Sequence, residues 1–220
     1  MPLRSGCLQK ALGLAVCLVL WGPFGQAQAQ ALAPVAADAL PTGGQVVSGV
    51  GRISQNGAAM VIEQKSQKMI TNWQQFNVGK DASVTFQQPN SAAVSLNRVR
   101  SMDPSQIHGR IQANGKVFLI NPNGVVFGSN AVVDAGGLLA STRDTADQDF
   151  LGGVMRFSGD SAGKVDQQGQ IRTPDGGFVV LIGQQVRQSG TVSGGKGAHL
   201  GLLSANRVQV NVAGNELVGY

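Results

Sequence analysis

The sequence predicts an all-β protein that coils as a β-solenoid. Short apolar runs with strand-like alternation follow one another, separated by Gly, Asn, Lys or Pro. Glycine makes up 31 of the 220 residues, about twice its usual ~7% share, and only 13% of residues are charged. Such a composition favours many short strands joined by tight turns over disorder. The runs in the first half are QVVSGVGRI (45–53), AAMVIEQ (58–64), ASVTFQQ (82–88) and AAVSLNRV (92–99).

A repeat in the second half indicates the solenoid. The segments GQI and GTV begin at Gly169 and Gly190, and GFVVLIG and GAHLGLL begin at Gly177 and Gly197, so both pairs recur at nearly the same interval. A period of roughly 20 residues is typical of stacked rungs of short strands. The segment GRI begins at Gly109, and its separation from Gly169 in the sequence corresponds to three such periods. The alternative is a β-sandwich with strands about 8–12 residues apart.

Finer predictions follow from this pattern. Val179, Leu181, Leu200 and Leu202 are candidates for one inward-facing ladder of the coil. The segment 72–76, NWQQF, interrupts the strands and is expected to form a turn or a short helical piece, and 103–105, DPS, resembles a helix start. No amphipathic helix of normal length is expected.

The N-terminal residues predict export. Arg4 and Lys10 precede an apolar stretch at 11–20 that is too short to span a bilayer, and small residues follow at Ala27 and Ala29. Residues 1–29 are therefore expected to be a signal peptide, 30–42 a lead-in segment that is loose at 31–39, and 43–220 one domain. The two cysteines, at positions 7 and 17, both fall in the signal peptide. Their absence from the mature chain fits passage through a narrow pore, or a β core that needs no disulfides.

Charge and motif content point away from several functions. Removing Arg4 and Lys10 leaves 15 basic and 12 acidic residues, a net charge of +3, with no basic cluster for nucleic acid. No catalytic group, metal site or cofactor site is expected. Asp144, Asp147 and Asp149 lack a calcium-loop pattern and are expected in a solvated loop, and the two histidines, at positions 108 and 199, have no neighbouring ligand residues.

The most distinctive stretch is 115–142, GKVFLINPNGVVFGSNAVVDAGGLLAST. Asn121, Pro122, Asn123 and Gly124 each suit a type I turn, and the flanking KVFLI and VVFG are β-branched and aromatic. This predicts a strand, a tight turn and a second strand.

The run KVFLINPNGVVFG, followed by GGLLAST, resembles the N-terminal secretion domain of two-partner secretion exoproteins, the filamentous-haemagglutinin-type family of haemagglutinins, haemolysins and adhesins. GRISQNGAAMVIEQKS, NWQQFNVGKDASVTFQQPNSAAVSLNRV and SQIHGRIQANGKVFLINPNG are similar to the family in the expected order, so the resemblance spans about residues 40–218. It implies a right-handed parallel β-helix with an N-terminal β cap and extra-helical strands. It also implies a non-enzymatic role, in which the domain engages the periplasmic domains of an Omp85-type outer-membrane transporter.

The resemblance also points to two short motifs. The NPNG-type motif is present as Asn121, Pro122, Asn123 and Gly124, whereas at the NPNL-type position, Gln88-Pro89-Asn90-Ser91, only Pro89 and Asn90 match. These residues are the candidates for transporter recognition, and the alternative is that they only form turns. Loss of an Asn side chain from such a turn is expected to cost about 1 kcal/mol of stability, so Asn121 and Asn123 are expected to matter more for export.

The resulting expectation is a targeting module, secreted to or beyond the surface of a Gram-negative bacterium through the periplasm. It would start β-helix folding of a longer exoprotein, whose downstream sequence would contact host-cell surfaces or glycans. Recognition could use main-chain pairing between an unfolded strand and a sheet edge of the transporter. Two alternatives are a carbohydrate-active β-helix enzyme and a free-standing adhesin.

Overall fold

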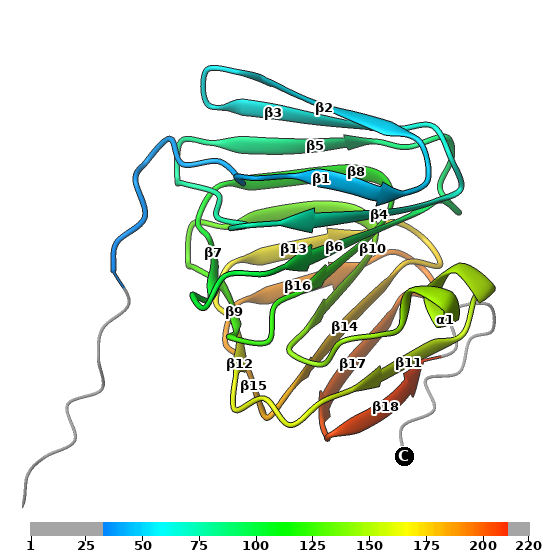
Figure 1. Ribbon diagram of the computed structural model, residues 1–220. Helices are drawn as coiled ribbons and strands as arrows, with labels where there is room; N and C mark the ends of the chain where they lie inside the picture. The colour runs from blue at the N-terminus through cyan, green and yellow to red at the C-terminus, as the bar shows by residue number, and fades with distance from the viewer. Residues whose placement is uncertain (1–32, 211–220) are drawn as a thin grey trace, which may run out of the picture. The chain divides into compact units, whose positions relative to one another are not determined.

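The computed structural model describes residues 33–210, which form a coil of three parallel sheets (Figure 1). We call the three sheets A, B and C, and each turn of the coil passes through sheet B, then sheet A, then sheet C. The predicted right-handed parallel β-helix with an N-terminal β cap and extra-helical strands is confirmed, and the parallel ladders exclude the sandwich. Sheet A holds β4 (Lys68–Trp73), β6 (Val94–Val99), the ends of β8 (Arg110–Ile120) and β10 (Val132–Ser141), β14 (Phe178–Gly183) and β17 (His199–Ser204).

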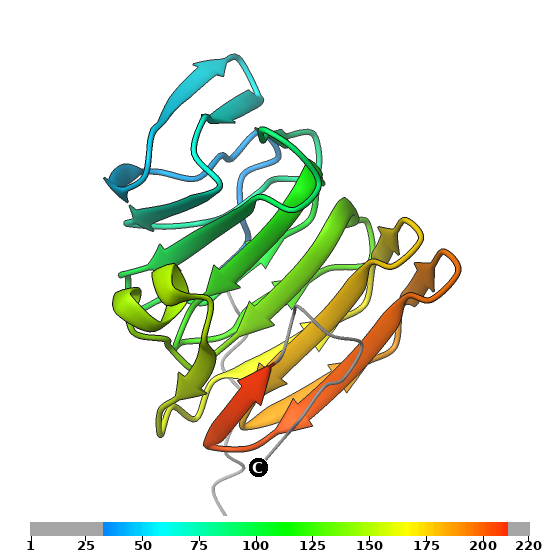
Figure 2. The ribbon, with the colours of Figure 1, turned by 90° about the vertical axis from the view of Figure 1, so that its right-hand side faces the viewer.

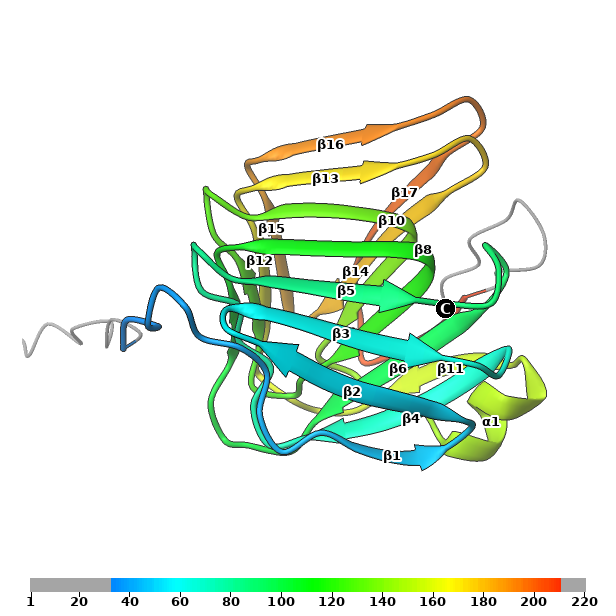
Figure 3. The same ribbon diagram turned by 90° about the horizontal axis from the view of Figure 1, so that it is seen from above.

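Sheet B forms the second wall, visible from above in Figure 3, and sheet C the third. β8 and β10 are long because they bend from sheet B into sheet A around Gly115 and Gly136. Sheet B contains β3 (Ala59–Gln64), β5 (Ser83–Gln87), the beginnings of β8 and β10, β13 (Gln170–Thr173) and β16 (Thr191–Gly194); sheet C contains β7 (Ser105–Ile107), β9 (Val125–Phe127), β12 (Lys164–Gln167) and β15 (Gln185–Gln188).

Two antiparallel strands cap the N-terminal end of the coil. β1 (Gln45–Ser48) pairs with β4, and β2 (Gly51–Asn56) pairs with β3. The run 45–53 is thus two strands, and the chain turns between them at Gly49 with φ +83°. The cap covers edges of sheets A and B that would otherwise template pairing with other chains.

The lead-in is better ordered than the sequence predicts. The side chain of Leu40 is buried in the main core, and the Ala39 carbonyl accepts a hydrogen bond of 2.8 Å from Gly79 N–H. A Cβ on Gly79 would lie 2.2 Å from the Ala36 carbonyl oxygen, so this glycine permits the close approach. The expectation of a loose segment at 31–39 is therefore wrong for residues 36–39, which pack against the chain at Gly79 and Asp81. The predicted signal peptide lies outside the described residues.

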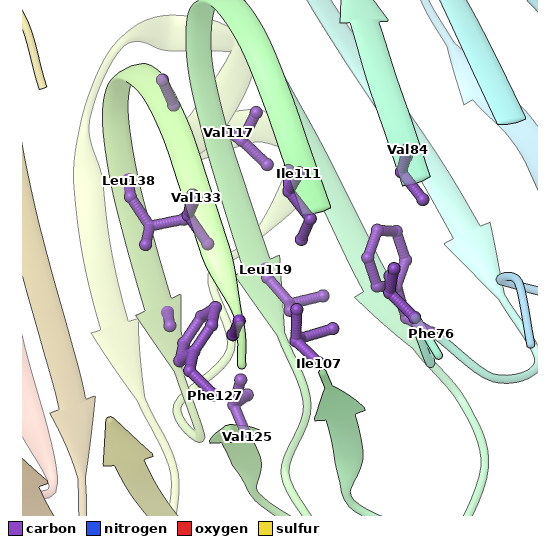
Figure 4. Packing of buried hydrophobic residues seen from close by; sticks show 14 of the residues in the cluster. Phe76, Val84, Ile107, Ile111, Val117, Leu119, Val125, Phe127, Val133 and Leu138 are labelled. Carbon is purple, nitrogen blue, oxygen red and sulfur yellow. The ribbon is translucent and has the colours of Figure 1, made fainter. Parts of the chain in front are cut away.

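The core fills the interior of the coil, where inward side chains of successive rungs stack (Figure 4). Val84 pairs with Ile111, Ile111 with Val133, and Val133 with Ile171, all at most 1% exposed. The two-residue alternation in these strands therefore places every second side chain in this ladder.

The glycine repeat marks one corner of the coil. A Cβ on Gly109 would lie 2.1 Å from the Gly79 carbonyl oxygen, and one on Gly190 would lie 2.1 Å from that of Gly169. Adjacent rungs approach too closely there for a side chain, which explains the recurring glycine. The count of three periods between Gly109 and Gly169 is wrong. The sheet register shows two, because Val132 pairs with both Arg110 and Gln170, and the second contains an excursion from the coil.

The predicted ladder is confirmed in register but not throughout in burial. Val179 pairs with Leu200, and Leu181 pairs with Leu202. Val179 and Leu181 are buried, whereas Leu200 and Leu202 are 48% and 45% exposed. The two leucines lie in β17, the last strand of sheet A in the described part of the chain, where no further rung covers them.

Two local predictions are wrong. Asn72 and Trp73 end β4, so the expected turn or helical piece is wrong for these two residues, and the chain leaves the strand only from Gln74. Trp73 packs edge-on against Phe76 with ring centroids 5.3 Å apart. The expected helix start at 103–105 leads into strand β7 at Ser105. In both places pairing with the neighbouring rung overrides the local turn and capping preferences.

A cover lies on the outer side of sheet A (Figure 2). We define it as helix α1 (Asp147–Gly152), β11 (Met155–Ser158) and β18 (Arg207–Val210). β11 and β18 pair antiparallel and are the extra-helical strands. Among residues 33–210, no helix has the length and apolar character needed to cross a membrane.

Candidate functional site: two turns of the coil

The turn at 121–124 connects sheet A to sheet C, between β8 and β9. Gly124 N–H donates to the Asn121 carbonyl at 3.0 Å, which closes the predicted turn. Gly124 has φ +122°, and a Cβ there would lie 3.0 Å from the Lys164 carbonyl oxygen of the following rung. The residue types in the motif therefore match the backbone geometry of the turn.

Asn121 is completely buried and links three rungs. Its side-chain amide donates to the Asp103 carbonyl and to the Ser105 hydroxyl, both at 3.0 Å. Its side-chain oxygen accepts from Asn123 N–H at 2.9 Å, and its own backbone N–H donates to the Ser141 carbonyl at 2.9 Å. In the folded domain this side chain has its hydrogen bonds within the coil and contributes to structure.

The rest of the motif is only partly covered. The Asn123 side-chain amide donates to the Ser101 carbonyl at 2.8 Å, and the Ser161 hydroxyl donates to the Pro122 carbonyl. Pro122 and Asn123 are nevertheless half-buried, whereas Asn121 and Gly124 are buried. Pro122 and Asn123 are thus the members of the motif that a partner of the folded domain could touch.

The weaker motif lies at a different corner, where β5 in sheet B leads to β6 in sheet A. The Asn90 side-chain oxygen accepts from Ala92 and Ala93 N–H at 3.0 and 3.1 Å. Pro89 and Asn90 are both exposed. The structure therefore does not bring the two motifs together in one corner of the coil, and they differ in burial.

Gln88, which matches no family motif residue, is the structural centre of this second corner. It is 7% exposed. Its side-chain amide donates at 3.2 Å to Gln64 Oε1 and to the Ala93 and Lys116 carbonyls, and its oxygen accepts from Gly115 N–H at 3.0 Å. Sequence reasoning missed this role. The signal that could have revealed it is Gln64, a second glutamine at the equivalent place one rung earlier.

The acidic cluster is held in ion pairs. Arg98, whose side chain is 6% exposed, contacts Asp144 at 2.8 Å and Asp147 at 2.9 Å. Burial by itself would lower the pKa of Arg98, but its hydrogen bonds and charge interactions with Asp144 and Asp147 outweigh burial and raise the pKa. Asp149 lies 3.7 Å from Arg156. The expected loop is therefore wrong for Asp147 and Asp149, which lie in the first turn of α1, although the side chains of Asp144 and Asp147 remain partly exposed to solvent. Asp144 and Asp147 attach this helix to the coil.

A family model described as the TPS secretion domain matches residues 36–218. The chain belongs to this family. Membership in the TPS secretion domain family, that of two-partner secretion exoproteins, implies secretion from a Gram-negative bacterium and a cognate outer-membrane transporter. The family is a secretion domain of exoproteins and not a known enzyme family.

Two relatives and one solved structure support the assignment. A heme/hemopexin-binding protein of Haemophilus influenzae is 36% identical over 162 residues, and another protein of that name and species is 47% identical over 85 residues. They cover 70% and 39% of this chain, which in turn spans 18% and 9% of their lengths. The HMW1 secretion domain from Haemophilus influenzae has a TM-score of 0.74 and 31% identity, covering 77% of this chain and 46% of that one.

Proposed function

We propose that this TPS secretion domain is a targeting module, which engages an Omp85-type outer-membrane transporter through that partner's periplasmic domains. The observation that carries the proposal is the family match over residues 36–218. On the same proposal the chain reaches the periplasm after removal of residues 1–29. N-terminal sequencing of exported protein tests this, and retention of Met1 would contradict it.

We further propose that the domain initiates β-helix folding of an exported adhesin- or haemolysin-like exoprotein. The asymmetry of the coil supports this. Antiparallel strands cap its N-terminal end, whereas β17 at the other end of the described part presents Leu200 and Leu202, both about half exposed, in ladder register. A parallel strand with half-exposed ladder residues is a suitable template for another rung.

The proposed recognition residues follow the two turns. Pro122, Asn123, Pro89 and Asn90 are accessible in part or in full in the folded domain. Asn121 and Gly124 are buried, so they could meet the transporter only before this corner has folded. We therefore assign direct contact first to the accessible residues, and to Asn121 and Gly124 a role in shaping the turn.

Co-expression tests the proposed function. The chain, joined to a reporter protein, is produced with and without its cognate outer-membrane transporter, and the reporter is measured in the culture supernatant and in the periplasm. Export that requires both the transporter and residues 34–210 is the expected result. Equal export of a reporter that lacks residues 34–210, or export without the transporter, would contradict the targeting role.

A further inference from the structure

The outer side of sheet A carries an unusual row of apolar side chains. Ile70 pairs with Leu96, Leu96 with Phe118, Phe118 with Leu139, and Leu139 with Val180. All five are fully buried although they point away from the interior of the coil. We call these five residues the outer row. An exposed row of this kind would be an interaction surface, so the elements that cover it control whether a partner can reach it.

The cover buries the outer row with side chains from its three elements. Phe150 of α1 and Phe157 of β11 approach Phe118 with ring centroids 6.1 and 6.5 Å away, and Val208 and Val210 of β18 belong to the same buried cluster. Figure 2 shows β11 and β18 lying over sheet A. A two-stranded sheet has little stability alone, so the cover depends on its attachment to the coil.

Positively charged side chains from early rungs attach helix α1, the first element of the cover, to the coil. Arg98 of β6 binds Asp144 and Asp147, and its guanidinium also donates to the Thr145 carbonyl at 2.8 Å. Lys68 of β4 donates to the Phe150 and Leu151 carbonyls at 3.0 and 2.7 Å, at the end of α1. α1 is thus attached at both ends to strands that precede it in the chain, and it is followed directly by β11.

β18 is held differently. It pairs with β11 through four register positions, from Met155–Val210 to Ser158–Arg207, and belongs to no sheet of the coil. Arg143 fixes the residues just before it, donating to the Ala205 carbonyl at 3.0 Å and to Asn206 Oδ1 at 2.9 Å. β18 is also the last strand of the described chain. Because β18 pairs only with β11, it can leave while every rung pairing among the described strands remains.

Without β18, the position that it fills against the outer row would be vacant. The edge of β11 would present unpaired backbone along its length, and the apolar side chains now against Val208 and Val210 would be uncovered. β18 itself, with the sequence RVQV, alternates exposed and buried residues. An occupant of this position must therefore be an extended strand with apolar side chains at every second residue, which adds to the edge of β11.

We propose that a strand of the transporter's periplasmic domains binds the edge of β11 in the place of β18, and is displaced when β18 docks. This inference rests on the proposed function, which supplies the partner. The order of the chain supports it, because α1 is attached to β4 and β6, and α1 and β11 both precede β18 in the sequence. Docking of β18 would then release the domain from the transporter.

A reversible crosslink tests whether β18 must leave. Arg156 and Gln209 face each other across β11 and β18, and paired strand residues lie within disulfide reach. The Arg156→Cys/Gln209→Cys protein is expected to bind the purified periplasmic domains about tenfold more weakly when oxidised than when reduced, because the open fraction sets the apparent affinity. Equal affinities in the two states would overturn the proposal. Arg52→Cys/Glu63→Cys, which links the exposed β2–β3 pair, is the matched control and should bind equally in both states.

A second variant tests the opposite direction. Val208→Asp places a carboxylate in the buried cluster and should displace β18 while the rungs keep their β circular dichroism. The variant is expected to bind about tenfold more tightly than the unchanged chain. Val47→Asp, at a 49% exposed valine of the cap, is the control and should bind like the unchanged chain. Unchanged affinity of Val208→Asp would overturn the proposal, and if reporter export stays transporter-dependent, the targeting function would still stand.

Discussion

The two turns that resemble family motifs have opposite surroundings. In the turn at 121–124, the leading residue Asn121 is buried and bonded to neighbouring rungs on both sides, and the next two residues are half-covered. In the turn at 88–91, Pro89 and Asn90 are exposed, and only Gln88 is buried. Similar residue types thus form a largely buried turn at one corner of the coil and a largely exposed turn at the other.

The difference shows that motif identity does not indicate what a substitution will disturb. A buried side chain whose partners cannot reach water leaves them unsatisfied when it is removed, and each such group costs free energy. An exposed turn residue leaves partners that water can satisfy. Four substitutions should separate these cases, in decreasing order of their expected effect on stability.

Asn121→Ala should be the most destabilising. It removes three side-chain hydrogen bonds and leaves the Asp103 carbonyl, the Ser105 hydroxyl and Asn123 N–H without this partner. We expect a loss of about 3 kcal/mol in the free energy of unfolding, well above the loss expected from the sequence. Urea unfolding of the purified domain measures it. A loss below about 1 kcal/mol would contradict the prediction, because it would show that the buried hydrogen bonds of Asn121 add little to the free energy of unfolding.

Gln88→Leu should come second, and it tests the motif mismatch. Leucine fills much of the same volume but leaves Gly115 N–H and the Lys116 carbonyl without the glutamine partner. A loss of about 2 kcal/mol is expected, again from urea unfolding. An unchanged midpoint would mean that the corner around Gln88 relaxes to admit water.

Asn123→Ala should cost about 1 kcal/mol, since one side-chain bond to Ser101 is lost at a half-buried position. On the proposed function, its export should fall severalfold more than its stability explains. The measurement is reporter export at a temperature where the domain stays folded. Ser101→Ala keeps the Ser101 carbonyl and so the bond, and serves as control. Normal export of Asn123→Ala would remove the recognition role from this residue.

Asn90→Ala should have the smallest effect on stability, about 0.5 kcal/mol, because water can reach the exposed Ala92 N–H and the buried Ala93 N–H keeps its hydrogen bond to the Asn90 carbonyl. Comparison with Gln88→Leu in the same denaturation series isolates the effect of burial within one turn. A cost as large as that of Gln88→Leu would contradict the difference between exposed and buried positions. Export of Asn90→Ala reports separately on the weaker motif.

Much of the fold could be predicted because the local pattern and the global structure agree. Alternating apolar runs became strands, and regularly spaced glycines became a corner where backbones nearly touch, as at Gly109 and Gly190. The predictions failed where a distant rung decided the outcome. Residues 103–105 have helix-start chemistry, yet Ser105 pairs with Val125 of the next rung and lies in a strand.

For the candidate site too, local sequence predicts one property, the turn itself, and does not predict another, its burial. The residues at 121–124 specify their own turn, because Asn, Pro and Gly set backbone geometry through local bonds and fixed dihedral angles. Their burial depends on the Asp103–Ser105 segment and on Ser161, which lie 16 to 39 positions away in the chain. Nothing in the local sequence reports those neighbours.

The amino-acid sequence was sufficient for the β class, the repeating rungs, the turn at 121–124 and the resemblance to secretion domains, because each depends on short-range periodicity or local backbone chemistry. Contacts between distant segments were needed to learn that Gln88 is buried, that Asp144 and Asp147 bind Arg98, and that β18 closes a cover over sheet A. The ion pairs join β6 to the start of α1, and the cover joins β11 to the last described strand. These contacts are fixed by which outward faces meet when the coil has formed, and an alternating strand pattern does not specify that.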